Sequence, residues 1–189
     1  WHATDFTINL TATDDLSGVV ETYYKINDGQ KQNLTAHGQP FIDTEGANNT
    51  LEFWSVDKAG NEELPHRILT GIKLDKTYPL MGAPSRTPQD DVLPYQPVEV
   101  SINVTDATSG VKDVILHYTL NNGTTWEQPM SMSMSNSTGF YEATIPGQPD
   151  DTWVRFKIVA SDYAGNNATI DGEQLYCMYR VISEYPTLI

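Results

Sequence analysis

Cysteine and positive charge are scarce in this sequence. A single cysteine, Cys177, stands among 189 residues, so no internal disulfide and no cysteine-based zinc cluster can form. Lys and Arg number 11 against 25 Asp and Glu, which gives a formal net charge of -14. Nucleic-acid binding and docking on an anionic membrane both need clustered basic residues. The composition therefore argues against both classes of partner.

Long apolar runs and catalytic motifs are also missing. No stretch approaches the ~18 apolar residues of a membrane span, so we expect no direct membrane insertion. The four histidines are scattered, and the sequence contains no Gly-x-Ser-x-Gly, phosphate loop or His-Glu-x-x-His. We predict that the protein is not an enzyme. Because the chain opens at Trp1 rather than Met, we interpret it as a piece of a longer protein.

An internal repeat organises the chain. Three blocks recur in the same order, namely residues 8–19 as 102–111, residues 24–29 as 118–123, and the Asp-x-Ala-Gly-Asn motif of 57–61 as 162–166. Such self-similarity indicates two copies of one unit. The joint is Asp75-Lys76-Thr77-Tyr78-Pro79, where proline ends strand pairing. We place one domain at residues 1–76 and a second, with a C-terminal extension, at residues 77–189.

Both copies have the pattern of β-strands and turns. Apolar and polar residues alternate over residues 6–13 and again over 98–105, which is the period of a half-buried strand. The segments 27–29 and 121–123 are rich in Asn and Gly and favour hairpin turns. The sequence predicts an all-β protein of two tandem antiparallel β-sandwiches. The first copy lacks about 20 residues that precede the matched strand of the second, so its first strand is expected to be missing or donated by a neighbour.

These motifs carry a family resemblance. The segments Asp15-Leu16-Ser17-Gly18-Val19 and Val56-Asp57-Lys58-Ala59-Gly60-Asn61, together with the Asp-x-Thr-x-Pro joint, resemble the immunoglobulin-like (Ig-like) repeats of bacterial and archaeal surface proteins. The OmpL47-like type is the most similar. In the second copy, the insertion Met130–Gly139 looks more like a fibronectin type III sandwich. The resemblance implies an extracellular, cell-surface location.

Asparagine sequons are unusually frequent. Seven of the twelve asparagines lie in the Asn-x-Ser/Thr pattern of N-glycosylation, namely Asn9, Asn33, Asn48, Asn103, Asn122, Asn136 and Asn167. The strand periodicity places Asn9 and Asn103 on the polar side of their strands. We predict glycosylation at these seven positions. The alternative is that a β-protein rich in Asn and Thr accumulates sequons by composition alone.

Aspartates recur at matched loop positions. Asp14 and Asp57 of the first copy correspond to Asp106 and Asp162 of the second, and Asp75 lies in the joint. We expect Asp75, Asp106 and Asp162 to converge, where their oxygens can hold Ca²⁺, with Asp14 and Asp57 as a second set. Related adhesin repeats bind Ca²⁺ at such joints, by resemblance only. The alternative is that each aspartate caps its own loop in an Asx-type turn, with no cofactor.

Two functions from different classes follow. The leading hypothesis is a non-catalytic spacer and assembly module of a glycosylated surface layer, filament or adhesin. Its partners would be neighbouring domains or subunits of the same assembly, including a homo-oligomer. The alternative is an ancillary polysaccharide-binding or linker module of a secreted hydrolase, which would grip sugars through Trp126, Trp153 or Tyr163.

Overall fold

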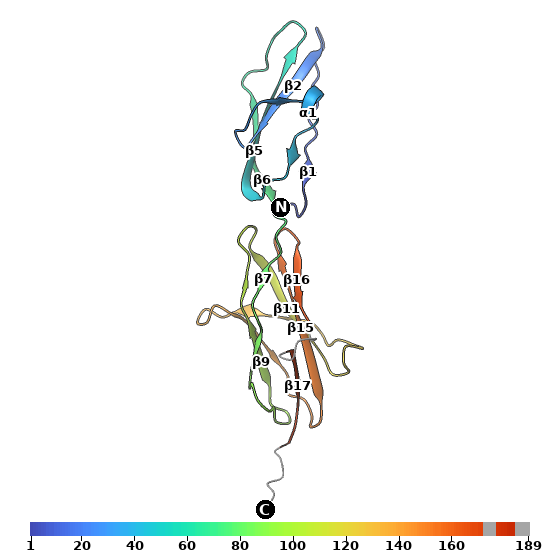
Figure 1. Ribbon diagram of the computed structural model, residues 1–189, viewed down its shortest axis with the longest axis vertical. Helices are drawn as coiled ribbons and strands as arrows, with labels where there is room; N and C mark the ends of the chain where they lie inside the picture. The colour runs from blue at the N-terminus through green and yellow to red at the C-terminus, as the bar shows by residue number, and fades with distance from the viewer. Residues whose placement is uncertain (172–176, 184–189) are drawn as a thin grey trace, which may run out of the picture. The chain divides into compact units, whose positions relative to one another are not determined.

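The computed structural model describes residues 1–171 and 177–183, and the chain forms two compact units, Trp1–Thr77 and Tyr78–Ile189. Within the described part of the chain, the regular structure is almost entirely strand, with one four-residue α-helix, and the strands pair antiparallel in several sheets (Figure 1). The predicted all-β fold class is confirmed. The predicted C-terminal extension includes residues 184–189, which lie outside the described residues.

The second unit is a β-sandwich of two sheets. One sheet has the order β12-β11-β15-β16, with β17 also paired to β15, and the other has the order β13-β14-β9-β8. A short additional pair joins β7 to β10. The strands are β7 (Leu80–Met81), β8 (Ser85–Thr87), β9 (Val98–Ile102), β10 (Val104–Thr105), β11 (Val111–Thr119), β12 (Met130–Ser131), β13 (Ser133–Met134), β14 (Tyr141–Ile145), β15 (Trp153–Asp162), β16 (Asn167–Ile170) and β17 (Met178–Arg180).

Strict alternation along its strands builds the core of the second unit. In β9, Val98, Val100 and Ile102 are buried, and every second residue of β15 from Val154 to Asp162 is buried as well. Each fully buried aliphatic or aromatic side chain contributes roughly 1.5–3 kcal/mol. Cys177 belongs to the same core, and its burial raises the pKa of the thiol to about 11. The cysteine is therefore an inert packing residue at neutral pH.

The segment Met130–Met134 departs from one continuous strand. Met132 is buried, but Met134 is exposed, because the chain leaves the β11 sheet after β12 and joins the β14 sheet as β13. The backbone N–H of Met132 donates to the Val114 carbonyl at 2.8 Å at this crossover. The segment Met130–Met134 thus contributes to both sheets of the sandwich.

The first unit is smaller and has one substantial sheet. Its order is β3-β2-β5-β6, and a second sheet consists of β1 paired with β4. The core gathers Tyr24, Ile42, Leu51 and Leu74. The elements are β1 (Phe6–Thr7), β2 (Val19–Ile26), β3 (Gln32–Asn33), α1 (Leu34–His37), β4 (Phe41–Ile42), β5 (Gly46–Asp57) and β6 (Arg67–Leu74).

The first strand of this unit is shorter than the alternation over residues 6–13 predicts. Ile8 donates its N–H to the Pro40 carbonyl at 2.9 Å, but Pro40 has no N–H to return. The side chain of Gln39 takes over the next step: its Oε1 accepts from the Leu10 N–H at 2.7 Å, and its Nε2 donates to the Leu10 carbonyl at 3.0 Å. A side-chain amide therefore replaces a backbone ladder here.

The free edge of β1 distinguishes the two units. In the second unit, β9 lies between β14 and β8, whereas in the described part of the first unit β1 pairs with β4 alone. A parallel bridge from His2 to Leu74 precedes β1, just as a bridge from Val92 to Val181 precedes β9. A strand equivalent to β8 is therefore the element that would complete the smaller sheet, and its donation by a neighbour stays a prediction.

Turn residues behave as their chemistry requires. Asn27 and Asp28 have φ of 51° and 56°, and Asn122 and Gly123 have φ of 56° and 87°. These are left-handed conformations that Asn, Asp and Gly adopt at low cost. The Asn/Gly segments therefore form the turns that the sequence predicts.

Candidate functional site

Asp106 and Asp162 hold two neighbouring loops of the second unit. Asp162 ends β15 in register with Val111, and Asp106 begins the loop that leads into Val111. Asp162 Oδ1 accepts from the N–H groups of Gly165 and Asn166 at 2.6 and 2.8 Å, and its Oδ2 accepts from Asn166 Nδ2 at 2.7 Å. The Asp-x-Ala-Gly-Asn motif is thus a loop closed on its own aspartate, as the capping alternative predicts.

The same two carboxylates also lie close to each other. A carboxylate oxygen of Asp106 and one of Asp162 are within 4.8 Å. Asp106 Oδ1 accepts from Gly110 N–H at 2.6 Å, but its Oδ2 is buried and has no hydrogen-bond partner in the described part of the chain. Two anionic groups at this separation repel each other, and an unpaired buried carboxylate oxygen is costly. The pair can supply oxygen ligands to a hard cation.

The first unit repeats this arrangement in a more open form. Asp57 is in register with Val19, and its two oxygens accept from the Asn61 side-chain amide at 2.7 Å and the Asn61 N–H at 2.8 Å. These bonds, the side-chain bond first, hold the pKa of Asp57 below its ordinary value. Asp14 and Asp57 line one hollow of about 500 Å³. The two loops are therefore neighbours here too.

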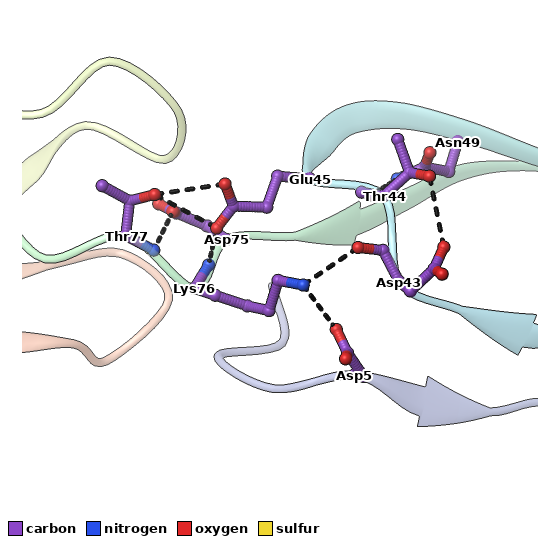
Figure 2. A network of polar contacts seen from close by, with 8 residues as sticks. All are labelled: Asp5, Asp43, Thr44, Glu45, Asn49, Asp75, Lys76 and Thr77. Atoms are coloured by element: carbon purple, nitrogen blue, oxygen red, sulfur yellow. Dashed lines mark hydrogen bonds and ion pairs between the residues drawn. The ribbon is translucent and has the colours of Figure 1, made fainter.

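The joint residues 75–77 are fastened to the first unit. Lys76 Nζ reaches Asp5 Oδ1 at 2.8 Å and the Asp43 carbonyl at 3.0 Å. Glu45 accepts from the Lys76 N–H, and both of its carboxylate oxygens accept from Thr77 Oγ1 at 3.1 Å. Figure 2 shows this network, in which Glu45 faces the joint. The sequence gives no signal for the Glu45 contacts, because the partners are 31 and 32 residues apart.

We expect Glu45→Ala to loosen the joint without unfolding the unit. The Lys76 amide loses an anionic acceptor, and a hydrogen bond to a charged group contributes about 1.5–3 kcal/mol. Hydrogen exchange of Lys76 should therefore accelerate by roughly tenfold or more. Residue-resolved exchange measures it, and Glu63→Ala, which removes the exposed Arg67 pair, is the control. Equal Lys76 exchange rates in wild type and Glu45→Ala would refute this role of Glu45.

The predicted glycosylation sites lie mostly on the surface. Six of the seven sequon asparagines are exposed: Asn9, Asn48, Asn103, Asn122, Asn136 and Asn167. Asn33 is half-buried and is the N-cap of α1, where its Oδ1 accepts from the Ala36 N–H at 2.9 Å. The side chains that glycosylation would modify are thus accessible at six positions.

The three predicted sugar-binding aromatics lie apart. Trp153 and Tyr163 are 54% and 60% exposed, but Trp153 begins β15 and Tyr163 follows its last residue. At about 3.3 Å per residue, some 30 Å of strand separates them. Trp126 is half-buried between, with Lys157 Nζ 4.3 Å from its ring and His117 at its edge. The structure therefore does not gather them into one platform.

A histidine that the sequence did not single out is held firmly in the first unit. The His66 ring lies parallel to Trp54 with centroids 4.0 Å apart. Its Nε2 contacts Glu62 Oε1 at 2.9 Å and its Nδ1 contacts Glu52 Oε1 at 2.7 Å, while Lys25 also pairs with Glu52. The carboxylates of Glu62 and Glu52 raise the pKa of His66 above its ordinary value.

The first unit should consequently lose stability as pH rises. A histidine whose pKa is higher in the folded state than in the unfolded state adds to the free energy of unfolding. This contribution is complete below the unfolded-state pKa of about 6.5 and is lost as the pH rises above the folded-state pKa. We expect a lower Tm at pH 9 than at pH 6, and a flatter profile in His66→Gln. His37→Gln, which removes an exposed histidine, is the control. A pH profile that His66→Gln leaves unchanged would contradict this assignment.

Residues 94–177 match the model of the bacterial Ig-like domain, a range that spans β9 to β16 and contains Asp106 and Asp162. The second unit contains an Ig-like module. Such domains are typically non-catalytic structural modules and commonly occur in extracellular and surface proteins. No curated protein matches the chain. In residues 1–171 and 177–183, no helix is long and apolar enough to span a membrane.

Proposed function

We propose that this chain is a non-catalytic spacer and assembly module of a glycosylated cell-surface protein, such as a surface layer, filament or adhesin. The observation that carries the proposal is the exposure of six sequon asparagines, four of which lie in the range that matches the bacterial Ig-like domain. Glycans on outward-facing strand and turn positions would keep an extended surface protein soluble and shielded. The paired sheets supply a stiff body for each unit, and Lys76 and Thr77 of the joint are fastened to the first unit.

Glycopeptide mapping of the protein purified from its native cell envelope tests this proposal. Enzymatic deglycosylation in H₂¹⁸O marks each formerly occupied asparagine as labelled aspartate. The proposal expects label at several of the six exposed sequons and least at Asn33, whose side chain caps α1. Unmodified peptides at all seven positions would overturn the glycosylated part of the proposal.

We assign the first unit to the OmpL47-like type and the second to a fibronectin type III-like variant of the Ig-like class.

The assembly partners follow from the same proposal. Neighbouring domains or subunits are the expected partners, including a second copy of the chain. The β1 edge supports this, since a strand equivalent to β8 can add there by backbone hydrogen bonding.

Calcium is proposed as a stabilising ion of the acidic loops. The support is the short Asp106–Asp162 separation and the buried Asp106 Oδ2 without a partner in the described residues. Asp75, the third predicted ligand, is five residues before Leu80, which pairs with Thr105 next to Asp106. Five residues reach at most about 17 Å, so chain length allows Asp75 to join the set. Asp14 and Asp57 remain the proposed second set.

Polysaccharide binding is the second candidate function. One observation favours it: the exposed Trp153 lines a hollow of about 380 Å³, within the usual size of small-molecule sites. Calorimetry with soluble polysaccharides tests it, and Trp153→Ala should abolish any saturable heat. Binding that survives this change, or no binding to any polysaccharide, would reject Trp153 as the basis of this function.

A further inference from the structure

A largely apolar hollow lies on the second unit beside a sequon. Its wall consists of Leu120, Asn121, Asn122, Trp153, Val154, Arg155 and Met178, and its volume is about 380 Å³. The register of the sheet explains the gathering: Thr119 pairs with Arg155, and Arg155 pairs with Met178. The turn after β11 and the start of β15 therefore border one space.

Asn122 belongs to the wall of this hollow and is also a glycosylation acceptor. It is the first residue of Asn122-Gly123-Thr124, is exposed, and occupies a left-handed turn position. Its neighbour Asn121 is fully engaged, with Oδ1 accepting from Thr125 N–H at 2.9 Å and Nδ2 donating to Thr125 Oγ1 at 2.7 Å. The turn is thus fixed by Asn121, which leaves the Asn122 amide available.

Two further side chains suit a sugar ring. Trp153 is 54% exposed, and the guanidinium of Arg180 lies 5.8 Å from its ring. Arg155 is half-buried in the wall, and its Nε is buried without a hydrogen-bond acceptor in the part of the chain that the structure describes. An unsatisfied buried donor is costly, and a sugar hydroxyl or acetamido carbonyl is a suitable acceptor once Arg155 reorients.

We infer that this hollow binds the first sugar of a glycan attached to Asn122. The inference rests on the proposed glycosylation. The bond would form between Asn122 Nδ2 and the anomeric carbon of a lipid-linked oligosaccharide; the nitrogen gives up one proton and the lipid phosphate leaves. The C–H face of the pyranose then covers Trp153, and its polar groups face Arg155. A tethered sugar occupies the hollow at high effective concentration, which excludes free polysaccharide.

A second sequon beside a hollow provides a contrast. Asn48 lines a space of about 440 Å³ whose wall is Asn27, Asp28, Glu45, Gly46, Ala47, Asn48, Asn49 and Thr50. No aromatic side chain belongs to that wall. A glycan at Asn48 is therefore expected to extend into solvent, whereas one at Asn122 packs on the protein.

A double-mutant cycle on the full chain tests whether the sugar on Asn122 packs in this hollow. The chain is produced in a eukaryotic host and trimmed by endoglycosidase to a single N-acetylglucosamine, and occupancy is verified by mass spectrometry. The four proteins are wild type, Asn122→Asp, Trp153→Ala and the double variant, with Asn136→Asp and Asn48→Asp as sequon controls. The aspartate at 122 preserves tolerance of positive φ.

Loss of the Asn122 sugar should lower Tm by about 3–6 °C when Trp153 is present and leave it unchanged in Trp153→Ala. The controls should show no dependence on Trp153, and NMR should detect contacts between the sugar protons and the Trp153 ring. An occupied Asn122 with equal effects in both backgrounds would overturn the inference while leaving glycosylation intact. So would an Asn122 that stays unmodified while other sequons are occupied. An entirely unmodified native protein would instead defeat the proposed function.

Discussion

Replacing Asp162 with alanine is expected to destabilise the second unit by about 3–5 kcal/mol. The side chain is 1% exposed and accepts three hydrogen bonds, from the N–H groups of Gly165 and Asn166 and from the Asn166 amide. Asn166 is itself only 7% exposed, so water cannot readily replace the lost acceptor. Each buried donor left without a partner costs about 1–3 kcal/mol. Urea unfolding followed by the amide NMR signals of β15 measures the loss.

The repeat supplies a matched control for this change. Asp57→Ala removes the equivalent bonds to Asn61 in the first unit, where the loop is exposed and water can take the place of the carboxylate. Asp57→Ala should therefore cost clearly less than Asp162→Ala. Equal losses at the two positions, or a loss below about 1 kcal/mol for Asp162→Ala, would show that burial does not govern the contribution of this motif.

Calcium should raise the thermal stability of the chain. At a free concentration one hundred times its Kd, a ligand that binds only the folded state stabilises by about 2.7 kcal/mol. For a unit of this size that corresponds to a Tm increase of roughly 10 °C. The reason is that a bound ion would relieve the repulsion between Asp106 and Asp162 and would provide a partner for the buried Asp106 Oδ2. Calorimetry in Ca²⁺ and in excess chelator measures it.

Single charge removals decide which residues hold the ion. Asp106→Asn should abolish the calcium response, and Asp75→Asn should weaken it if the joint residue is the third ligand. Asp113→Asn removes one exposed negative charge from the same unit and should leave the response intact. A Tm that chelator does not alter would favour the alternative in which the aspartates cap their own loops.

Features with a strict local signature were predictable from the sequence. Alternating apolar residues such as Val98, Val100 and Ile102 indicate which face of a strand is buried, because successive side chains point to opposite faces. The Asn and Gly turns state where the chain reverses. The matched positions of Asp106 and Asp162 follow from the repeat itself. The strand and turn signatures depend on neighbours within a few residues, and the repeat is visible by comparing the two halves of the sequence.

Features that depend on distant pairing could not be predicted. The Gln39 side chain makes the hydrogen bonds of the Leu10 backbone from 29 residues away. These bonds are needed only because of the observed register and the proline at position 40. The stacking of His66 on Trp54 requires the loop after β5 to fold back over its strand. The sequence pattern of the Trp153 region likewise said nothing of a hollow, since Leu120 and Met178 enter it from other strands and loops.

The location of the protein on intact cells tests the central claim most directly. Immunogold electron microscopy with an antibody against the folded second unit should place the label on the outer cell envelope, at regular spacing within a lattice or along filaments. Label confined to the cytoplasm, or recovered only in secreted enzyme fractions bound to polysaccharide, would contradict a structural surface module.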